Sequence, residues 1–254
     1  MVGGHIFMKK GLNANQIKLI AIIAMTIDHI ADILFPGFPA EPVPILLHII
    51  GRLTAPIMWF FICEGFFYTR NLKKYLLRMF TFAVVSHFAY CFAFGINYIP
   101  FSTGELFSQT SVIWPLAWAL VALWINKNGD QFKPWQKNLL LGVIYIINIP
   151  ADWATIAVLA IVSMYAYRGN LEKQMKEMMI YVVIYALISF VFVNKVYGVI
   201  SLFVILVYWV LKQYNGQKGK GNWMKWLFYI YYPGHLVVIG ILRLLIYGNV
   251  PLLF

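Results

Sequence analysis

Runs of about 20 mostly apolar residues recur along the chain and are separated by short charged segments. A helix needs about 20 apolar residues to cross a bilayer core of about 30 Å. Of the 254 residues, 62% are hydrophobic and 11% are charged, too few polar side chains to cover a soluble domain of this length. The sequence therefore predicts an all-α, polytopic membrane protein, a single transmembrane domain over 1–254, with 1–14 as a flexible N-terminus.

We expect about nine spans, within a range of about eight to ten, because each needs one such run. The fifth and sixth are short for two crossings, and we expect them to be hinged at Pro150. No signal-peptide pattern precedes the first run, so it is interpreted as a retained span. The predicted spans are 15–36, 44–67, 75–95, 110–126, 136–150, 152–167, 178–193, 196–212 and 226–247.

The formal net charge of +11 is distributed in a way that argues against a nucleic-acid partner. Most of the 20 Lys and Arg lie on alternate connections, while the connections between them carry Lys195 alone. This asymmetry is the positive-inside pattern, which predicts a cytoplasmic N-terminus and an exported C-terminus. The basic connections fall near 9–18, 70–78, 127–137, 168–176 and 212–225.

Three titratable side chains stand inside the first apolar run, in the stretch MTIDHIADILF over 25–35. Ionisable groups in hydrocarbon are costly unless paired or hydrated, so they indicate a function or a deliberate structural pair. At a rise of 1.5 Å per residue, His29 lies roughly 20 Å above the cytoplasmic face. The same arithmetic brings Asp28, His29, Arg52 and His87 to one depth in three consecutive helices. Arg52 is the expected counter-charge of Asp28.

Asp32 lies one turn after Asp28 and His29, so all three side chains can face one cavity. Adjacent residues diverge by about 100° around a helix, so His29 is expected to bond Asp32 or another helix rather than Asp28. A carboxylate beside an imidazole fixes its tautomer and raises its basicity. The alternative is a structural ion pair between Asp28 and Arg52, with His29 as a packing residue.

Basic and aromatic side chains cluster in the segment EGFFYTRNLKKYLLR over 64–78. Such groups at a helix junction can hold a nucleotide through its phosphates. Attraction to anionic lipid and a topology signal are the alternative explanation. The residues that we assign to a phosphate-bearing cofactor here are Glu64, Tyr68, Arg70, Lys73, Lys74 and Arg78.

The last span carries FYIYYPGHL over 228–236. A proline removes a helical hydrogen bond, and the freed carbonyl is tolerated in a membrane only against protein or a cavity. We expect Pro233 and Gly234 to loosen the helix and to place His235 roughly 14 Å above the cytoplasmic face, between the two polar layers. Packing is the alternative role for this histidine. Hydroxyl groups for the same cavity can come from Tyr229, Tyr231 and Tyr232.

Three motifs resemble the TraX family of bacterial membrane proteins. They read IKLIAIIAMTIDH in the first span, GRLTAPIMWFFICEGFFYTRNLKKYLLR through the second, and FYIYYPGHL in the last. The middle of the chain, about 95–220, matches in hydropathy, with ADW over 151–153 and YAYR over 165–168 as further points of similarity. Asp32 and the proline-rich loop FPGFPAEPVP depart from the family pattern.

The resemblance implies N-acetylation of a pilin-type subunit and a distant similarity to transmembrane acyltransferases. It implies an acyl-CoA-dependent N- or O-acyltransferase of the cytoplasmic membrane that uses acetyl-CoA and no metal. The acceptor stays open between a peptide N-terminus, an amino sugar and a polysaccharide, and a homo-oligomer is possible. Asp28 and His29 would carry the transfer chemistry, with the rest of the site formed by Arg52, Glu64, Arg70, Lys74, Arg78 and His235.

Two other function classes fit the same residues. Asp28, His29, Arg52 and His87 at mid-depth also make a proton relay, as in a proton-coupled transporter or flippase. The sequence shows no inverted repeat of discontinuous spans, which such carriers often have. A non-catalytic membrane assembly factor is the third interpretation.

Overall fold

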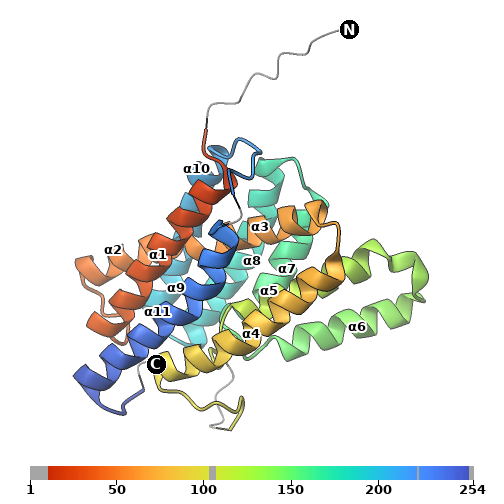
Figure 1. Ribbon diagram of the computed structural model, residues 1–254. Helices are drawn as coiled ribbons and strands as arrows, with labels where there is room; N and C mark the ends of the chain where they lie inside the picture. Colours follow the sequence, from red (N-terminus) through yellow and green to blue (C-terminus); the bar gives the residue numbers. More distant parts are fainter. Residues whose placement is uncertain (1–10, 103–106, 222, 252–254) are drawn as a thin grey trace.

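The computed structural model describes residues 11–102, 107–221 and 223–251, which form a bundle of helices (Figure 1). Residues 1–10 of the predicted N-terminal tail lie outside the described residues. The α-helices are α1 Ala14–Leu34, α2 Pro42–Gly51, α3 Thr54–Tyr68, α4 Leu72–Phe94, α5 Ile113–Lys127, α6 Pro134–Ile147, α7 Ala154–Ala166, α8 Leu171–Phe192, α9 Lys195–Ser201, α10 Val207–Lys212 and α11 Trp223–Tyr247. The 3₁₀ segments are η1 Gly129–Gln131 and η2 Leu202–Leu206.

Every predicted span lies on a helix or on a continuous run of helices, and the hinge at Pro150 separates α6 from α7. The described residues include five stretches that are long and apolar enough to cross a membrane, which indicates a membrane protein. α5 and α7 are apolar but shorter. Nine crossings and a cytoplasmic N-terminus stay predictions. The five stretches are Pro42–Tyr68, Leu72–Phe94, Leu171–Phe192, Lys195–Lys212 and Trp226–Tyr247.

Asparagine side chains cap the first turns of four helices, three long ones and the short α9. Asn13 Oδ1 accepts from the backbone N–H of Gln16, and the Gln16 side chain accepts from the Asn13 N–H, which completes a capping box. Such a cap satisfies N–H groups that have no partner in the first turn. The start of each of these four helices is therefore set by the asparagine in the preceding connection. The other caps of this kind are Asn71 on α4, Asn170 on α8 and Asn194 on α9.

Connections from distant parts of the sequence pair at the two ends of the bundle. At one end, backbone hydrogen bonds of 2.7–2.9 Å join 12–14 to 213–217. At the other end, backbone hydrogen bonds join 109–110 to 150–152. The first of these ends carries basic connections and is called the basic end below. Two of the predicted basic connections, those near 9–18 and 212–225, thus meet at the same end of the fold.

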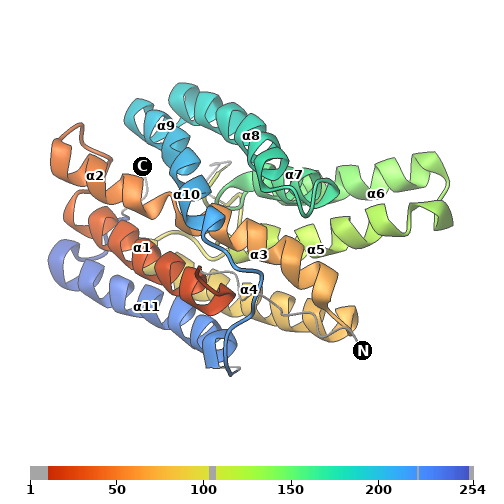
Figure 2. The same ribbon diagram turned by 90° about the horizontal axis from the view of Figure 1, so that it is seen from above.

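The middle of the bundle is formed by α1, α3, α5 and α7, whose contacting faces are buried. α11 packs along α4, whereas α6 lies on the outside beside α5 (Figure 2). Large apolar side chains also cover the outer faces of the long helices, for example Leu187 and Phe192 on α8 and Leu245 on α11. An outer surface this apolar suits lipid rather than water.

The span predicted over 44–67 is interrupted at its centre. α2 ends at Gly51 and α3 begins at Thr54, and the turn between them brings Arg52 to the middle of the bundle. The Thr54 hydroxyl donates to the carbonyl of Ala21 at 3.2 Å, which ties the interruption to α1. Irregular backbone at membrane depth is tolerated where it lies against protein or lines a cavity. The interruption therefore marks the position of the polar site.

Candidate active site

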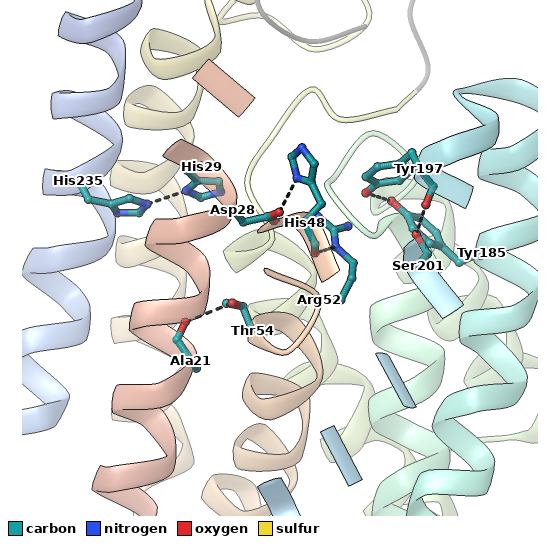
Figure 3. A network of polar contacts seen from close by, with 10 residues as sticks. All are labelled: Ala21, Asp28, His29, His48, Arg52, Thr54, Tyr185, Tyr197, Ser201 and His235. Atoms are coloured by element: carbon teal, nitrogen blue, oxygen red, sulfur yellow. Dashed lines mark hydrogen bonds and ion pairs between the residues drawn. The ribbon is translucent and has the colours of Figure 1, made fainter. Parts of the chain in front are cut away.

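Asp28 on α1 is held by two side chains from α2 and the turn after it (Figure 3). Arg52 Nη2 donates to Asp28 Oδ2 at 2.8 Å, which confirms the predicted counter-charge. His48 Nδ1 lies 2.8 Å from Asp28 Oδ1, so the carboxylate–imidazole pair of this site involves His48. His48 was not among the residues predicted for the site. It could have been predicted from its position four residues before Arg52, because residues at this spacing lie on the same face of a helix.

Gly51 provides the space that the Asp28 carboxylate occupies. A Cβ on Gly51 would overlap with Cγ and Oδ1 of Asp28, whereas a Cβ on Gly142 of α6 would meet nothing within 4 Å. We expect Gly51→Ala to lower the free energy of unfolding by about 1–3 kcal/mol, as overpacking does. Thermal unfolding in detergent measures this. Gly142→Ala is the control, expected to be neutral or stabilising by up to about 1 kcal/mol. Equal melting temperatures for both variants would contradict the account.

His29 bonds a histidine from the last helix and not a carboxylate. His29 Nδ1 lies 2.7 Å from His235 Nε2, and His235 Nδ1 lies 3.0 Å from the carbonyl oxygen of Tyr231. His235 is therefore level with His29, and its predicted place between two polar layers was wrong. The helix is not broken at the predicted position, since α11 continues as one helix through Pro233. The depth arithmetic failed because α11 begins at Trp223, so His235 stands higher on it.

A small cavity of about 80 Å³ opens beside these residues, and we call it the histidine cavity. As predicted, Asp28, His29 and Asp32 all line it. Asp152 also lines it, from the connection between α6 and α7, so the segment ADW belongs to the site. Arg52 also lines it and packs over the ring of Tyr197, 5.0 Å from its centroid. One cation thus stands among three carboxyl groups.

His87 does not join this cluster. Its Nδ1 lies 3.0 Å from Thr110 Oγ1, and its Nε2 lies 2.9 Å from the carbonyl oxygen of Tyr98. Both ring nitrogens are thus engaged by the connection between α4 and α5. The sequence placed His87 by depth alone, and depth does not specify the direction in which a side chain leaves its helix. A proton relay through His87 loses its support.

A larger cavity of about 610 Å³ lies at the basic end, and we call it the basic cavity. Tyr75, Arg78, Met79 and Phe82 line it from one face of α4. Lys18 on α1 and Lys218 after α10 line it from other directions, and neither was among the residues predicted for this site. The structure does not bring three predicted residues to this cavity, because their exposed side chains leave α4 and the turn before it on other sides. These are Arg70, Lys73 and Lys74.

Glu64 and Tyr68 line the basic cavity from the end of α3, as predicted. The Glu64 carboxylate is paired with Arg168, with Nε–Oε1 and Nη2–Oε2 distances of 2.8 and 3.1 Å. Arg168 lies over the ring of Phe67, 3.5 Å from its centroid. Burial alone would lower the pKa of Arg168, but the hydrogen bond and charge of Glu64 outweigh it and hold that pKa above its ordinary value. The pair leaves the remaining cations of the cavity in excess.

The two cavities have one apolar wall in common. Four residues line both of them: Met58, Ile113, Leu116 and Phe228. They come from α3, α5 and α11, which are packed into the bundle. The basic cavity and the histidine cavity are thus adjacent and are separated by apolar side chains.

Comparisons with known proteins identify the family. A family model described as TraX protein matches residues 13–243. A protein of Dichelobacter nodosus, described as probable fimbrial assembly protein FimC, serogroup H1, is 30% identical over 235 residues, which cover 89% of this chain and 94% of that protein. No solved structure matches. The match spans α1 to α11 and contains both cavities, and the chain belongs to the TraX family.

Proposed function

We propose that the protein is an acyltransferase of the bacterial cytoplasmic membrane. It moves an acetyl group from cytoplasmic acetyl-CoA to an amine or hydroxyl acceptor at or beyond the outer side of the membrane. His29 is the base or the acyl carrier, and Asp28 and Arg52 form the charged layer beside it. The acceptor classes are a peptide N-terminus, an amino sugar and a polysaccharide. The name of the fimbrial relative is in keeping with a peptide.

The apolar wall common to the two cavities is the observation that carries this proposal. CoA has phosphates at one end, a long arm in the middle and the thioester at the other end. The basic cavity offers Lys18, Arg78 and Lys218 to phosphate oxygens, and its volume is typical of ligand sites. An arm that passes Met58 and Phe228 would bring the thioester to the histidine cavity.

The proposed reaction consumes one acceptor and one thioester. The acceptor transfers its proton to His29 Nε2 as its nitrogen or oxygen bonds to the carbonyl carbon. The carbon–sulfur bond then breaks, and the CoA thiolate takes the proton from His29. Arg52 carries five N–H donors, and its bonds to Asp28, to the His48 carbonyl and to the Tyr197 side chain use three of them. A remaining donor is available to the developing negative charge on the carbonyl oxygen.

Removal of cations from the basic cavity tests the donor. In the double variant Lys18→Gln and Arg78→Gln, we expect the Kd for CoA to rise by at least about tenfold. Charge-assisted hydrogen bonds contribute about 1.5–3 kcal/mol each, so the loss of one is enough for this change. Isothermal titration calorimetry of the purified protein in detergent measures the Kd.

The matched control is the double variant Arg70→Gln and Lys74→Gln. It removes the same charge from the same end of the bundle at positions that do not line the cavity. Equal losses of affinity in both doubles would indicate a general electrostatic effect rather than a site.

Incubation with radiolabelled acetyl-CoA tests the reaction itself. Label on the protein would indicate an acyl carrier, and label on an added amine or hydroxyl compound would indicate direct transfer. Proton-coupled flux in vesicles without any transfer of label would favour the transporter interpretation instead.

A further inference from the structure

The hydrogen bonds around His235 fix the position of the proton on each ring of the histidine pair. A carbonyl oxygen only accepts, so His235 Nδ1, 3.0 Å from Tyr231 O, carries a proton. His235 is buried, its nearest polar partners are an imidazole and a carbonyl, and an unpaired charge at this depth is costly, so its ring is neutral. A neutral imidazole has one N–H, so His235 Nε2 is an acceptor.

The proton between the two rings therefore belongs to His29. His29 Nδ1 donates to His235 Nε2 across 2.7 Å, and the neutral His29 ring keeps its lone pair on Nε2. The ring planes lie within 5° of parallel with centroids 5.0 Å apart, while the bonded nitrogens are only 2.7 Å apart. The nitrogens thus point at each other along the line between the rings, as in an N–H···N bond (Figure 3).

His29 Nε2 is the nitrogen left for chemistry. It makes no hydrogen bond with the described part of the chain, and His29 lines the histidine cavity. We infer that His235 is a positioning residue, which holds His29 in the tautomer with a proton on Nδ1 and a basic Nε2. The catalytic meaning of this tautomer rests on the proposed function, whereas the tautomer itself does not.

The role assigned to His235 resembles that of a carboxylate behind a catalytic histidine, with one difference. A carboxylate adds negative charge, whereas a neutral imidazole adds only an acceptor. When His29 takes up a proton on Nε2, its Nδ1–H remains bonded to His235 Nε2. The pair can then share the charge, because His235 Nε2 has a lone pair for the proton. Groups of this kind orient the ring that does the chemistry.

Nitrogen NMR of the full chain, labelled with ¹⁵N-histidine, measures the tautomer directly. The chain has 5 histidines, and the His29 signals are identified by their loss in His29→Ala. In the unmodified protein we expect a protonated Nδ1 and an unprotonated Nε2 on His29. A protonated Nε2 with a free Nδ1 would overturn the inference whether or not the protein transfers acyl groups.

Two variants of His235 test what holds the tautomer. His235→Gln keeps an acceptor, since the amide oxygen of glutamine reaches about as far as imidazole Nε2, and we expect the tautomer and most of the transfer rate to remain. His235→Leu has no acceptor, so the Nδ1–H preference should disappear and the rate should fall about 10–100-fold, as for other orienting partners. An unchanged tautomer in a folded His235→Leu protein would overturn the inference. The expected tautomers in a protein that transfers no acyl group would support the inference and count against the proposed function alone.

Discussion

Replacement of His29 by alanine is expected to abolish acyl transfer while CoA still binds. A positioned base contributes about 10²–10⁴-fold to a rate, so the turnover number should fall by at least about a hundredfold. The cations that we propose for the CoA phosphates line the basic cavity, across the apolar wall from His29, so the Kd for CoA should change little. Steady-state transfer of radiolabelled acetyl and calorimetric binding of CoA measure the two quantities.

His87→Ala is the matched control for this change. It also removes a half-buried histidine, but one whose ring bonds Thr110 and Tyr98 and does not line the histidine cavity. The control should keep a transfer rate close to that of the unmodified protein. A well-folded His29→Ala protein with unchanged turnover would contradict the mechanism.

Replacement of Asp28 by alanine is expected to have the largest effect on stability. It would leave the Arg52 guanidinium, whose side chain is 7% exposed, without its carboxylate. Removing one partner of a buried ion pair costs about 3–5 kcal/mol of unfolding free energy. It would also leave His48 Nδ1 without its acceptor. The melting temperature in detergent, followed by circular dichroism, should fall clearly.

Two further variants distinguish the contribution of the Asp28–Arg52 ion pair from that of the other charged groups in the cavity. Asp28→Ala with Arg52→Met removes both charges and should be more stable than Asp28→Ala alone, because no unpaired charge remains. Asp32→Ala removes a carboxyl group from the same helix and cavity that forms no ion pair with the described side chains, and it should change the melting temperature little. Equal melting temperatures for Asp28→Ala and the unmodified protein would show that the pair contributes nothing to stability.

Helix positions and the common level of Asp28 and Arg52 could be predicted from the sequence, whereas the level of His235 could not. Both depend on a fixed rise per residue and on the length of apolar runs, which the sequence contains directly. The pairing of Asp28 with Arg52 is the clearest success, since an arginine at that depth needs a carboxylate. The contact between His48 and Asp28 could have been predicted in the same way, because His48 lies one turn before Arg52 on the same helix face.

Side-chain directions were harder to predict, because each helix can turn about its own axis until its neighbours are known. His87 lies on the predicted helix, but its side chain bonds the connection between α4 and α5. His235 bonds His29 from a helix that begins earlier in the sequence than expected. The same limit applies to Lys74 and Arg78, which are four residues apart on α4. Only Arg78 lies on the face that lines the basic cavity. Charge density in the sequence could not distinguish them.

The spacing of the polar bonds along the chain determines the order in which they can form during synthesis. Asp28 meets His48 and Arg52 after 20 and 24 further residues, whereas His29 meets His235 only after 206. At about 5–20 residues per second, the ribosome needs about 10–40 s to supply that second partner. The charged layer of α1 is therefore neutralised early, while the membrane still holds only the first few helices. A nascent chain that stops before α11 contains the Asp28–Arg52 pair but lacks the histidine pair, so the proposed acyl transfer would begin only when translation has nearly ended.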